Sequence, residues 1–167
     1  HADAVHGAEI CRDLQDRLVM IARVSDAGAF VNTNALTLKR SHGDYSVMQL
    51  LYDGSEIKAV LDFVNAGEVP IAWELIRSYS YMDCTFNAAR LAAYTNEYRR
   101  YAEVSMDDLR YMPYLYLGQL LSSTYGYKQY LQTGDEELLA FGRWRTEMCR
   151  YLIANAGEVS AELVRLA

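Results

Sequence analysis

The sequence predicts a mainly α-helical α+β domain that contains one small β-hairpin. Apolar residues recur at helical spacing near the start of the chain and again after Pro70. Between these regions lie two short runs of β-prone residues separated by turn-forming residues. The 167 residues are enough to bury one hydrophobic core, so we expect a single domain over residues 1–167.

The first expected element is a helix from Ala8 to Val24, because its apolar side chains recur every three or four residues. Four apolar side chains would share one face of this helix: Ile10, Leu14, Leu18 and Ile21. The segment from Ser25 to Arg40 has no clear period, so we expect a loop there.

The hairpin is expected next. The β-prone runs at residues 50–52 and 57–63 flank Asp53-Gly54-Ser55, and this combination is typical of a tight reversal of the chain. Antiparallel pairing of the two runs would carry the end of the second run back to the segment that precedes the first run.

The hairpin register follows from the length of the turn. If three residues form the turn, Tyr52 lies opposite Glu56. The ladder then returns Asp62 to the neighbourhood of Ser46, or of Tyr45 if the register slips by one residue.

The remaining elements are expected to be helices. Pro70 suits the first turn of a helix that carries Ile71, Leu75 and Tyr79 on one side. Further helices are expected at four places: Phe86–Tyr101, from Ser105 onward with a kink or an interruption at Pro113, Asp135–Ile153, and Val159–Leu166.

Composition excludes several classes of function. The net charge of −6 and the lack of a basic run argue against nucleic-acid binding. No apolar run reaches the length of roughly 20 residues needed to span a membrane. Three widely spaced cysteines give neither a disulfide framework nor a zinc-binding pattern, so we expect a reducing, cytoplasmic location.

Three oxygen-bearing side chains suggest a specific chemistry: Asp44, Gln49 and Asp62. Phosphoryl transfer to an alcohol needs a carboxylate near the acceptor hydroxyl and hard oxygen ligands for Mg²⁺. Protein kinases place an amide ligand five residues after the catalytic aspartate and a second aspartate, followed by phenylalanine, further on. Asp44 and Gln49 have this spacing, and Phe63 follows Asp62.

The order of motifs is similar to that of the aminoglycoside phosphotransferase family, which includes choline-kinase-like and homoserine-kinase-like enzymes. The similarity rests on three segments: His42-Gly43-Asp44 with Gln49, Val60-Leu61-Asp62-Phe63, and Ala72-Trp73-Glu74-Leu75. The resemblance implies a protein-kinase-like C-terminal lobe whose hairpin carries the catalytic and metal-binding residues. It also implies ATP as co-substrate, Mg²⁺ as cofactor and a hydroxyl group of a small molecule as acceptor.

Carried over to this chain, the resemblance implies that Asp44 is the catalytic base, Asp62 the main Mg²⁺ ligand and Gln49 the second ligand. It further implies that His42 and Glu74 support the catalytic loop. A cationic acceptor would suit the acidic chain.

The chain departs from the family pattern at three positions. Gln49 stands where the family has asparagine, Glu74 where it has aspartate, and Val64 where it often has a polar residue. These differences leave a catalytically inactive binding or scaffold protein open as an alternative. A helical interaction module with accidental motifs is a further alternative, in which Asp44 and Asp62 would point apart.

A nucleotide-covering lobe is not apparent in the sequence. The chain contains no G-x-G step, and Lys39, Lys58 and Lys128 do not lie in a V-A-I-K-like strand before the catalytic loop. We therefore expect that this chain is the catalytic and substrate-binding lobe, that the N-terminal nucleotide lobe is absent from it, and that this piece is inactive alone.

Overall fold

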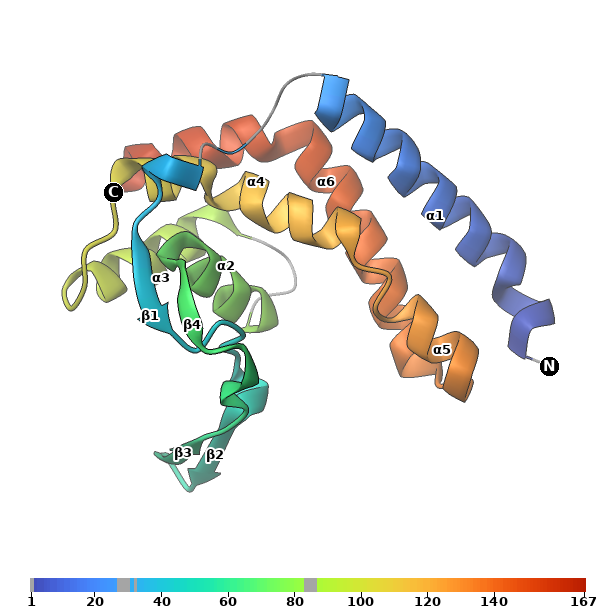
Figure 1. Cartoon of the computed structure of the whole chain (residues 1–167), viewed down its shortest axis with the longest axis horizontal. Coiled ribbons are helices and arrows are strands. Elements are labelled where there is room, and N and C mark those ends of the chain that lie inside the picture. The colour runs from blue at the N-terminus through green and yellow to red at the C-terminus, as the bar shows by residue number, and fades with distance from the viewer. Residues whose placement is uncertain (1, 27–30, 32, 83–86) are drawn as a thin grey trace. The chain divides into compact units, whose positions relative to one another are not determined.

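The computed structural model describes residues 2–26, 31, 33–82 and 87–167. Within these residues the chain is mostly helical and has two small antiparallel sheets (Figure 1), which confirms the mainly helical α+β class. The helices are α1 (Ala2–Asp26), α2 (Ile71–Met82), α3 (Ala88–Arg99), α4 (Met106–Ser122), α5 (Tyr127–Thr133) and α6 (Glu136–Leu166).

Short elements connect the helices. The strands are β1 (Leu38–Ser41), β2 (Leu50–Asp53), β3 (Glu56–Val60) and β4 (Gly67–Pro70). Three 3-10 turns lie between or before them: η1 (Thr33–Ala35), η2 (Val47–Gln49) and η3 (Phe63–Asn65).

The chain forms two compact units. The first unit contains His1–Val31 and Leu117–Ala156, and the second contains Asn32–Tyr116 and Gly157–Ala167, so the division falls within α4 and α6. The expectation of one domain over residues 1–167 stays a prediction.

In the first unit, α1, α5 and the N-terminal part of α6 surround a small apolar core. Its buried side chains are Ile10, Tyr127, Tyr130 and Leu139. The predicted helix is present and longer than expected, but its predicted apolar face is partly wrong. Leu18 and Ile21 are 66% and 38% exposed, whereas Arg17 and Met20 are buried.

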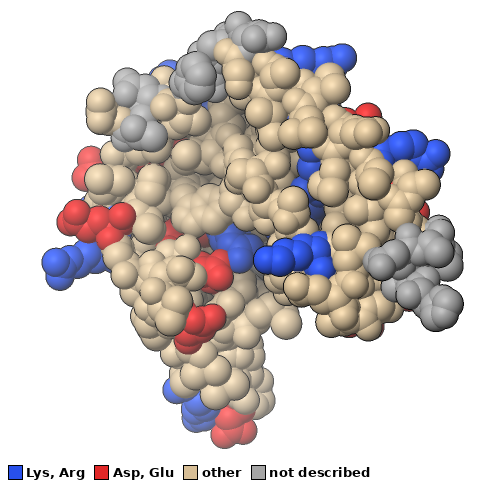
Figure 2. All heavy atoms as spheres, turned by 45° about the vertical axis from the view of Figure 1, so that its right-hand side comes forward, with Lys and Arg blue, Asp and Glu red and all other residues tan. Residues whose placement is uncertain are grey.

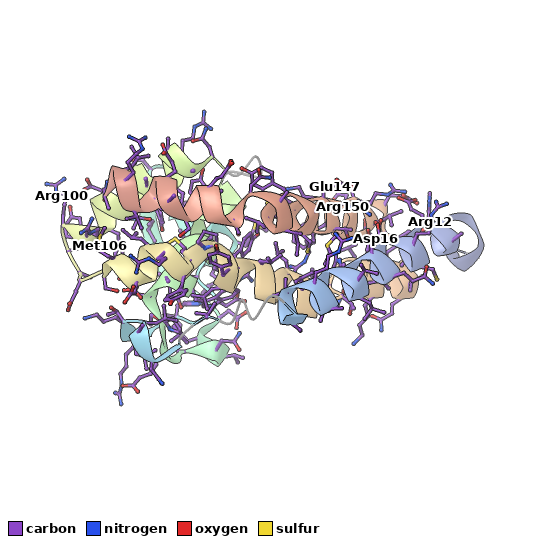
Figure 3. All side chains as sticks on the ribbon, turned by 90° about the horizontal axis from the view of Figure 1, so that it is seen from above. Arg12, Asp16, Arg100, Met106, Glu147 and Arg150 are labelled. Atoms are coloured by element: carbon purple, nitrogen blue, oxygen red, sulfur yellow. The ribbon has the colours of Figure 1, made fainter. Side chains whose placement is uncertain are left out.

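Ion pairs join α1 to α6 at the surface of the first unit. Arg150 of α6 donates to Asp13 and Asp16 of α1 over 2.9 and 2.6 Å, and it also pairs with Glu147. Figure 3 shows Arg150 directed toward Asp16 between the two helices. These contacts fix α1 against α6 within this unit.

Two glycines allow a close approach in the same unit. A Cβ atom added to Gly126 would lie 2.7 Å from the backbone nitrogen of Gly142. One added to Gly142 would lie 2.5 Å from the ring of Tyr127. The start of α5 therefore packs against α6 at a distance that only glycine permits.

The second unit contains both sheets. The β2–β3 hairpin is confirmed, but its register differs from both predicted alternatives. Asp53 pairs with Glu56 and Tyr52 with Ile57, because Gly54 and Ser55 alone form the turn. Gly54 has a φ of 61°, as required at the first central position of a type II′ turn.

A register shift between Leu51 and Tyr52 moves the rest of the ladder by one further residue. Leu50 therefore lies opposite Val60, and Asp62 lies beyond the ladder instead of facing Ser46. Hairpin side chains such as Leu51, Tyr52 and Ile57 are about half exposed, and Figure 2 shows a largely uncharged projection with charged atoms at its tip.

The expected loop from Ser25 to Arg40 is only partly correct. Helix α1 continues to Asp26, and Leu38–Ser41 forms β1, which pairs antiparallel with the unpredicted strand β4. Residues 27–30 and 32 lie outside the described part of the chain. Strand β1 leads directly into the His42-Gly43-Asp44 segment, so the β1–β4 pair positions that segment.

Helices α2 and α3 were predicted close to their observed bounds. Helix α2 begins immediately after Pro70 and buries Ile71, Leu75 and Tyr79. Helix α3 starts after its N-cap Asn87, whose side chain accepts a hydrogen bond from a backbone N–H of the first turn. Phe86, the predicted start, lies outside the described residues.

Helix α4 begins at the predicted cap. The Ser105 hydroxyl accepts from the N–H of Asp108 at 3.0 Å, and the Asp108 carboxylate accepts from the N–H of Ser105 at 2.8 Å. The other carboxylate oxygen of Asp108 accepts from the N–H of Thr37 at 2.9 Å. This fully buried aspartate therefore joins the helix start to the segment before β1.

Two predicted breaks in the C-terminal half are wrong. Helix α4 is not interrupted at Pro113, although the predicted kink there stays a prediction, and α6 is one helix of 31 residues, not two helices separated before Val159. Gly157 lies inside α6. One internal glycine costs only about 1 kcal/mol, which is too little to end a long helix. Helix α5 was not predicted.

Within the described residues, Cys11 and Cys149 are free thiols, and no helix is long and apolar enough to cross a membrane. Cys84 lies outside those residues.

Candidate active site

His42 lies at the centre of the candidate site and is only 7% exposed. Its Nε2 atom lies 2.6 Å from the carbonyl oxygen of Leu61, so Nε2 must carry the proton that it donates. The unprotonated Nδ1 atom then accepts from the N–H of Asp44 at 3.4 Å. The histidine thus connects the end of the hairpin to the backbone of the candidate base.

Gly43 is required for contact between the two motifs. Its φ is 81°, and an added Cβ atom would lie 2.1 Å from the carbonyl oxygen of Asn65. The backbone of the His42-Gly43-Asp44 segment therefore packs directly on η3, the turn that follows Asp62. The ring of Phe63 in that turn lies 4.7 Å from the ring of His42, centroid to centroid.

Helix α2 holds the same segment from another direction. The Glu74 carboxylate accepts hydrogen bonds from the Ser41 hydroxyl at 3.2 Å and from the N–H of Gly43. Trp73 donates its indole N–H to the carbonyl oxygen of Gly43 over 3.1 Å. Both backbone groups of Gly43 are thus bound by neighbouring residues of α2.

Arg77, one turn further along α2, binds Asp44 itself. Its Nε atom donates to Asp44 Oδ1 over 2.7 Å, and its NH2 group donates to the same oxygen. The guanidinium also lies over the Trp73 ring, 5.9 Å from its centroid. Asp44 Oδ2 has no hydrogen-bond donor among the residues that the structure describes.

Arg77 was missed in the sequence analysis. The only available signal was its position four residues after Trp73, which places both side chains on one face of a helix. That spacing does not reveal that Asp44 is the partner.

Gln49 and Asp62 come from either side of the hairpin. The N–H of Leu61 donates to the backbone oxygen of Gln49 over 2.8 Å, which brings the two segments together. The side-chain oxygen of Gln49 accepts a hydrogen bond from the Ser46 hydroxyl. Asp62 is exposed, and its carboxylate does not cap η3.

The backbone of Asp62 has an unusual conformation. Its φ of 61° and ψ of 60° lie in the left-handed region, where it is the one non-glycine residue among those described. Such a conformation is uncommon for a residue with a side chain, though aspartate tolerates it better than most. It turns the chain out of β3 and into η3, so that Leu61 O reaches His42 and Phe63 contacts the same ring.

The hairpin thus returns to the His42-Gly43-Asp44 segment as predicted, through Leu61 and not through the ladder position expected for Asp62. The catalytic role of Asp44, the metal-binding roles of Asp62 and Gln49, and the supporting roles of His42 and Glu74 stay predictions. Within the described part of the chain no cluster of three or more histidine, cysteine or acidic side chains could hold a metal ion. A Mg²⁺ site does not require such a cluster, because one or two protein ligands are usual and phosphates and water complete its coordination.

Comparison with known proteins supports the motif assignment. A model of the family described as "Phosphotransferase enzyme family" matches residues 8–104, which is more than half of the chain. No curated protein and no solved structure gives a significant match. The matched region includes most of α1, the β2–β3 hairpin, the His42-Gly43-Asp44 segment and α2. The interpretation of the motifs as accidental is therefore wrong, and the chain belongs to the phosphotransferase enzyme family.

Proposed function

We propose that this chain provides the base and the metal ligands of an ATP-dependent kinase that phosphorylates a hydroxyl group of a small molecule. The observation that supports this most directly is the position of Leu61, which bonds through its N–H to Gln49 and through its carbonyl to His42. These two bonds join two of the three motif segments, the one that contains His42 and Gln49 and the one that contains Leu61 and Asp62.

Asp44 is suited to act as the base. Arg77 occupies Oδ1, so Oδ2 remains for a hydrogen bond from the acceptor hydroxyl. Asp44 would orient the hydroxyl oxygen toward the γ-phosphorus and accept its proton as the new O–P bond forms. The bond between the γ-phosphorus and the bridging oxygen breaks, and the electron pair leaves with ADP.

The residues present fit a Mg²⁺ ion. The Asp62 carboxylate is exposed and makes no capping bond, so it is available as a ligand. Gln49 would supply its amide oxygen, which now accepts from the Ser46 hydroxyl and would have to exchange that bond. When bound, Mg²⁺ would neutralise charge on the nucleotide phosphates.

The finer features of the assignment also belong to this proposal. They are a protein-kinase-like C-terminal-lobe fold, a nucleotide lobe supplied from outside these residues, and a small acceptor that is cationic. A cytoplasmic location and the absence of nucleic-acid partners likewise stay predictions.

The decisive experiment is Asp44→Asn in the full-length protein. We expect the rate of phosphoryl transfer to fall by about 10²–10⁴-fold, because the amide cannot take the proton. Nucleotide affinity should change little, since Asp44 would contact the acceptor and not ATP. Asp53→Asn, at the exposed hairpin turn, is the matched control and should be fully active. Full activity in Asp44→Asn would refute the assignment of the base.

One observation favours the alternative of an inactive binding protein. The amide oxygen of Gln49 is already used by Ser46 in this structure. Thermal unfolding of the full-length protein with and without MgATP separates the two functions. A magnesium-dependent rise in the unfolding temperature favours the kinase, and no shift favours the binding protein.

A further inference from the structure

A pocket of about 340 Å³ lies behind the catalytic loop, between α2, α3 and the residues on either side of Gly43. Its polar walls come from Ser41, His42, Tyr45, Glu74, Ser78, Tyr94 and Tyr98. This volume is at the lower end of the range for small-molecule sites. Asp44, Gln49 and Asp62 do not line it, so an occupant would not lie in the position of the attacking hydroxyl.

Glu74 gives the pocket a negative charge. The residue is only 7% exposed, and its Oε1 atom accepts both bonds from the catalytic loop. Its Oε2 atom has no hydrogen-bond donor among the residues that the structure describes, and Glu74 forms no ion pair with them. A buried carboxylate without a cation is unfavourable, and a bound cation would relieve that cost.

Tyrosines complete the polar surface. The hydroxyl groups of Tyr94 and Ser78 bond to each other over 2.7 Å. Burial raises the pKa of Tyr45 and the pKa of Tyr98, and the charge of Glu74 raises the pKa of Tyr98 further. The Tyr98 hydroxyl therefore lies within the field of the Glu74 carboxylate. The hydroxyl groups of Tyr45 and Tyr98 form no hydrogen bond to another described residue.

The rest of the wall is apolar. Ile71 and Leu75 contribute aliphatic surface beside the aromatic rings. The combination is complementary to a short organic cation with N–H donors at one end and a hydrocarbon tail at the other. A hydrated metal ion would not match the aliphatic and aromatic wall.

We propose that this pocket binds a small primary ammonium compound, with its N–H groups bonded to Glu74 Oε2 and the neighbouring phenols. Because the other oxygen of Glu74 holds the N–H of Gly43, the bound compound also stabilises the catalytic loop. Binding itself is independent of the proposed kinase function. Any effect of the stabilised loop on the rate of phosphoryl transfer would rest on that function, because the loop contains Asp44.

The test compares two probes of nearly equal shape. n-Butylammonium chloride is titrated into the protein by calorimetry without nucleotide, and n-butanol with an equal concentration of sodium chloride is titrated in parallel. We expect n-butylammonium to bind at least about tenfold more tightly than n-butanol, because a charge-assisted hydrogen bond is lost in the alcohol. Equal responses to the two probes in the wild-type protein would overturn the proposal.

Two substitutions in the pocket test whether n-butylammonium binds there. Ser78→Leu fills the pocket and should abolish binding of n-butylammonium, while Glu74→Gln keeps an acceptor for Gly43 and should weaken binding at least about tenfold. Asp107→Asn, at a partly exposed acidic residue on α4 that does not line the pocket, is the control and should bind normally. Unchanged binding in either pocket variant would overturn the proposal. If Ser78→Leu does not fold, Tyr98→Leu tests the same wall.

The result of these titrations can be distinguished from the result of the Asp44→Asn experiment on the proposed base. No nucleotide is present in these titrations, so an active Asp44→Asn variant would not affect them. n-Butylammonium has no hydroxyl group and cannot act as an acceptor in transfer, and the loss of binding in Ser78→Leu and Glu74→Gln assigns its binding to the pocket.

Discussion

In the first unit, Arg17 is 2% exposed, and its guanidinium donates to four different groups. Nε and NH2 bond to the Thr146 hydroxyl at 2.9 and 2.7 Å, and further bonds reach the carbonyl oxygens of Leu120, Ser123 and Gly142. In the second unit, Arg77 directs two donors at one oxygen of Asp44 and leaves the other oxygen available. Both arginines lie on helices, but only Arg77 binds a partner that keeps an unused acceptor, the Oδ2 atom of Asp44.

The same contrast holds for the carboxylates. In the first unit, Asp13 and Asp16 both pair with Arg150. In the second unit, Glu74 has one unused oxygen and the Asp62 carboxylate does not cap its turn. Satisfied polar groups contribute to stability, whereas unused acceptors are available to a ligand. We therefore expect the charged groups compared here to affect mainly stability in the first unit and mainly ligand binding in the second, and mutations should show the difference.

The largest effect is expected for Arg17→Met. The variant removes the hydrogen bonds from Arg17 to the Thr146 hydroxyl and to the carbonyl oxygens of Leu120, Ser123 and Gly142. We expect the free energy of unfolding to fall by about 3–5 kcal/mol, as measured by urea denaturation. Arg23→Met, an exposed arginine in the last turn of α1, should change it by less than about 0.5 kcal/mol. Equal effects would show that Arg17 is not structural.

A smaller loss is expected for Gly142→Ala. The added methyl group would meet the Tyr127 ring, which is 1% exposed and held by a hydrogen bond from its hydroxyl to Asp13. Overpacking should cost about 1–3 kcal/mol, partly offset by the higher helix propensity of alanine. Gly118→Ala in α4 meets no atom within 4 Å and should stabilise by up to about 1 kcal/mol. Opposite signs in thermal denaturation are the expected result.

Local signals in the sequence predicted the parts of the site that depend on neighbouring residues. Gly54 marked the hairpin turn, Pro70 the start of α2, and the Ser105 hydroxyl the start of α4. In each case one residue determines the backbone geometry within a few positions, so no knowledge of distant contacts is needed.

Contacts between distant segments could not be predicted in this way. Strand β4 has four residues and ends at Pro70, which gives little periodicity and no strand propensity at its end. The register of the hairpin was wrong because Gly54 and Ser55 alone form the turn, and because the further shift between Leu51 and Tyr52 has no sequence signal. The bond from Arg77 to Asp44 spans 33 positions and depends on how α2 packs against the loop.

Arg77→Met should separate function from stability in the second unit. Asp44 would lose both donors that orient its carboxylate, and we expect the rate of phosphoryl transfer in the full-length protein to fall at least about tenfold. The free energy of unfolding should fall by only about 1 kcal/mol, less than for Arg17→Met, since both partners are partly exposed. Arg100→Met, which removes an exposed pair with Glu97, is the control. A large loss of stability with normal activity would show that Arg77, like Arg17, has a structural role.

The smallest effect is expected for the partly exposed pair of Glu9 and Arg143 in the first unit. The hydrogen bond from Arg143 lowers the pKa of Glu9 below its ordinary value of 4.5. Because the folded pKa is the lower one, the pair stabilises the protein above about pH 4.5, and this contribution is lost as the pH falls through the folded pKa. Glu9 is 35% exposed, so solvent screening should limit the contribution to less than about 1 kcal/mol.

Glu9→Gln tests this by urea denaturation from pH 7 down to pH 3. The difference in unfolding free energy from the wild type should be largest near pH 7 and should shrink as the pH falls below 4.5. Glu137→Gln is the matched control, because the structure shows no ion pair for Glu137 within the described residues, and its difference should vary less with pH. A Glu9→Gln difference that grows toward low pH would contradict the sign of the shift. It would also show that the Glu9–Arg143 pair does not stabilise the first unit, in contrast to the hydrogen bonds of the buried Arg17.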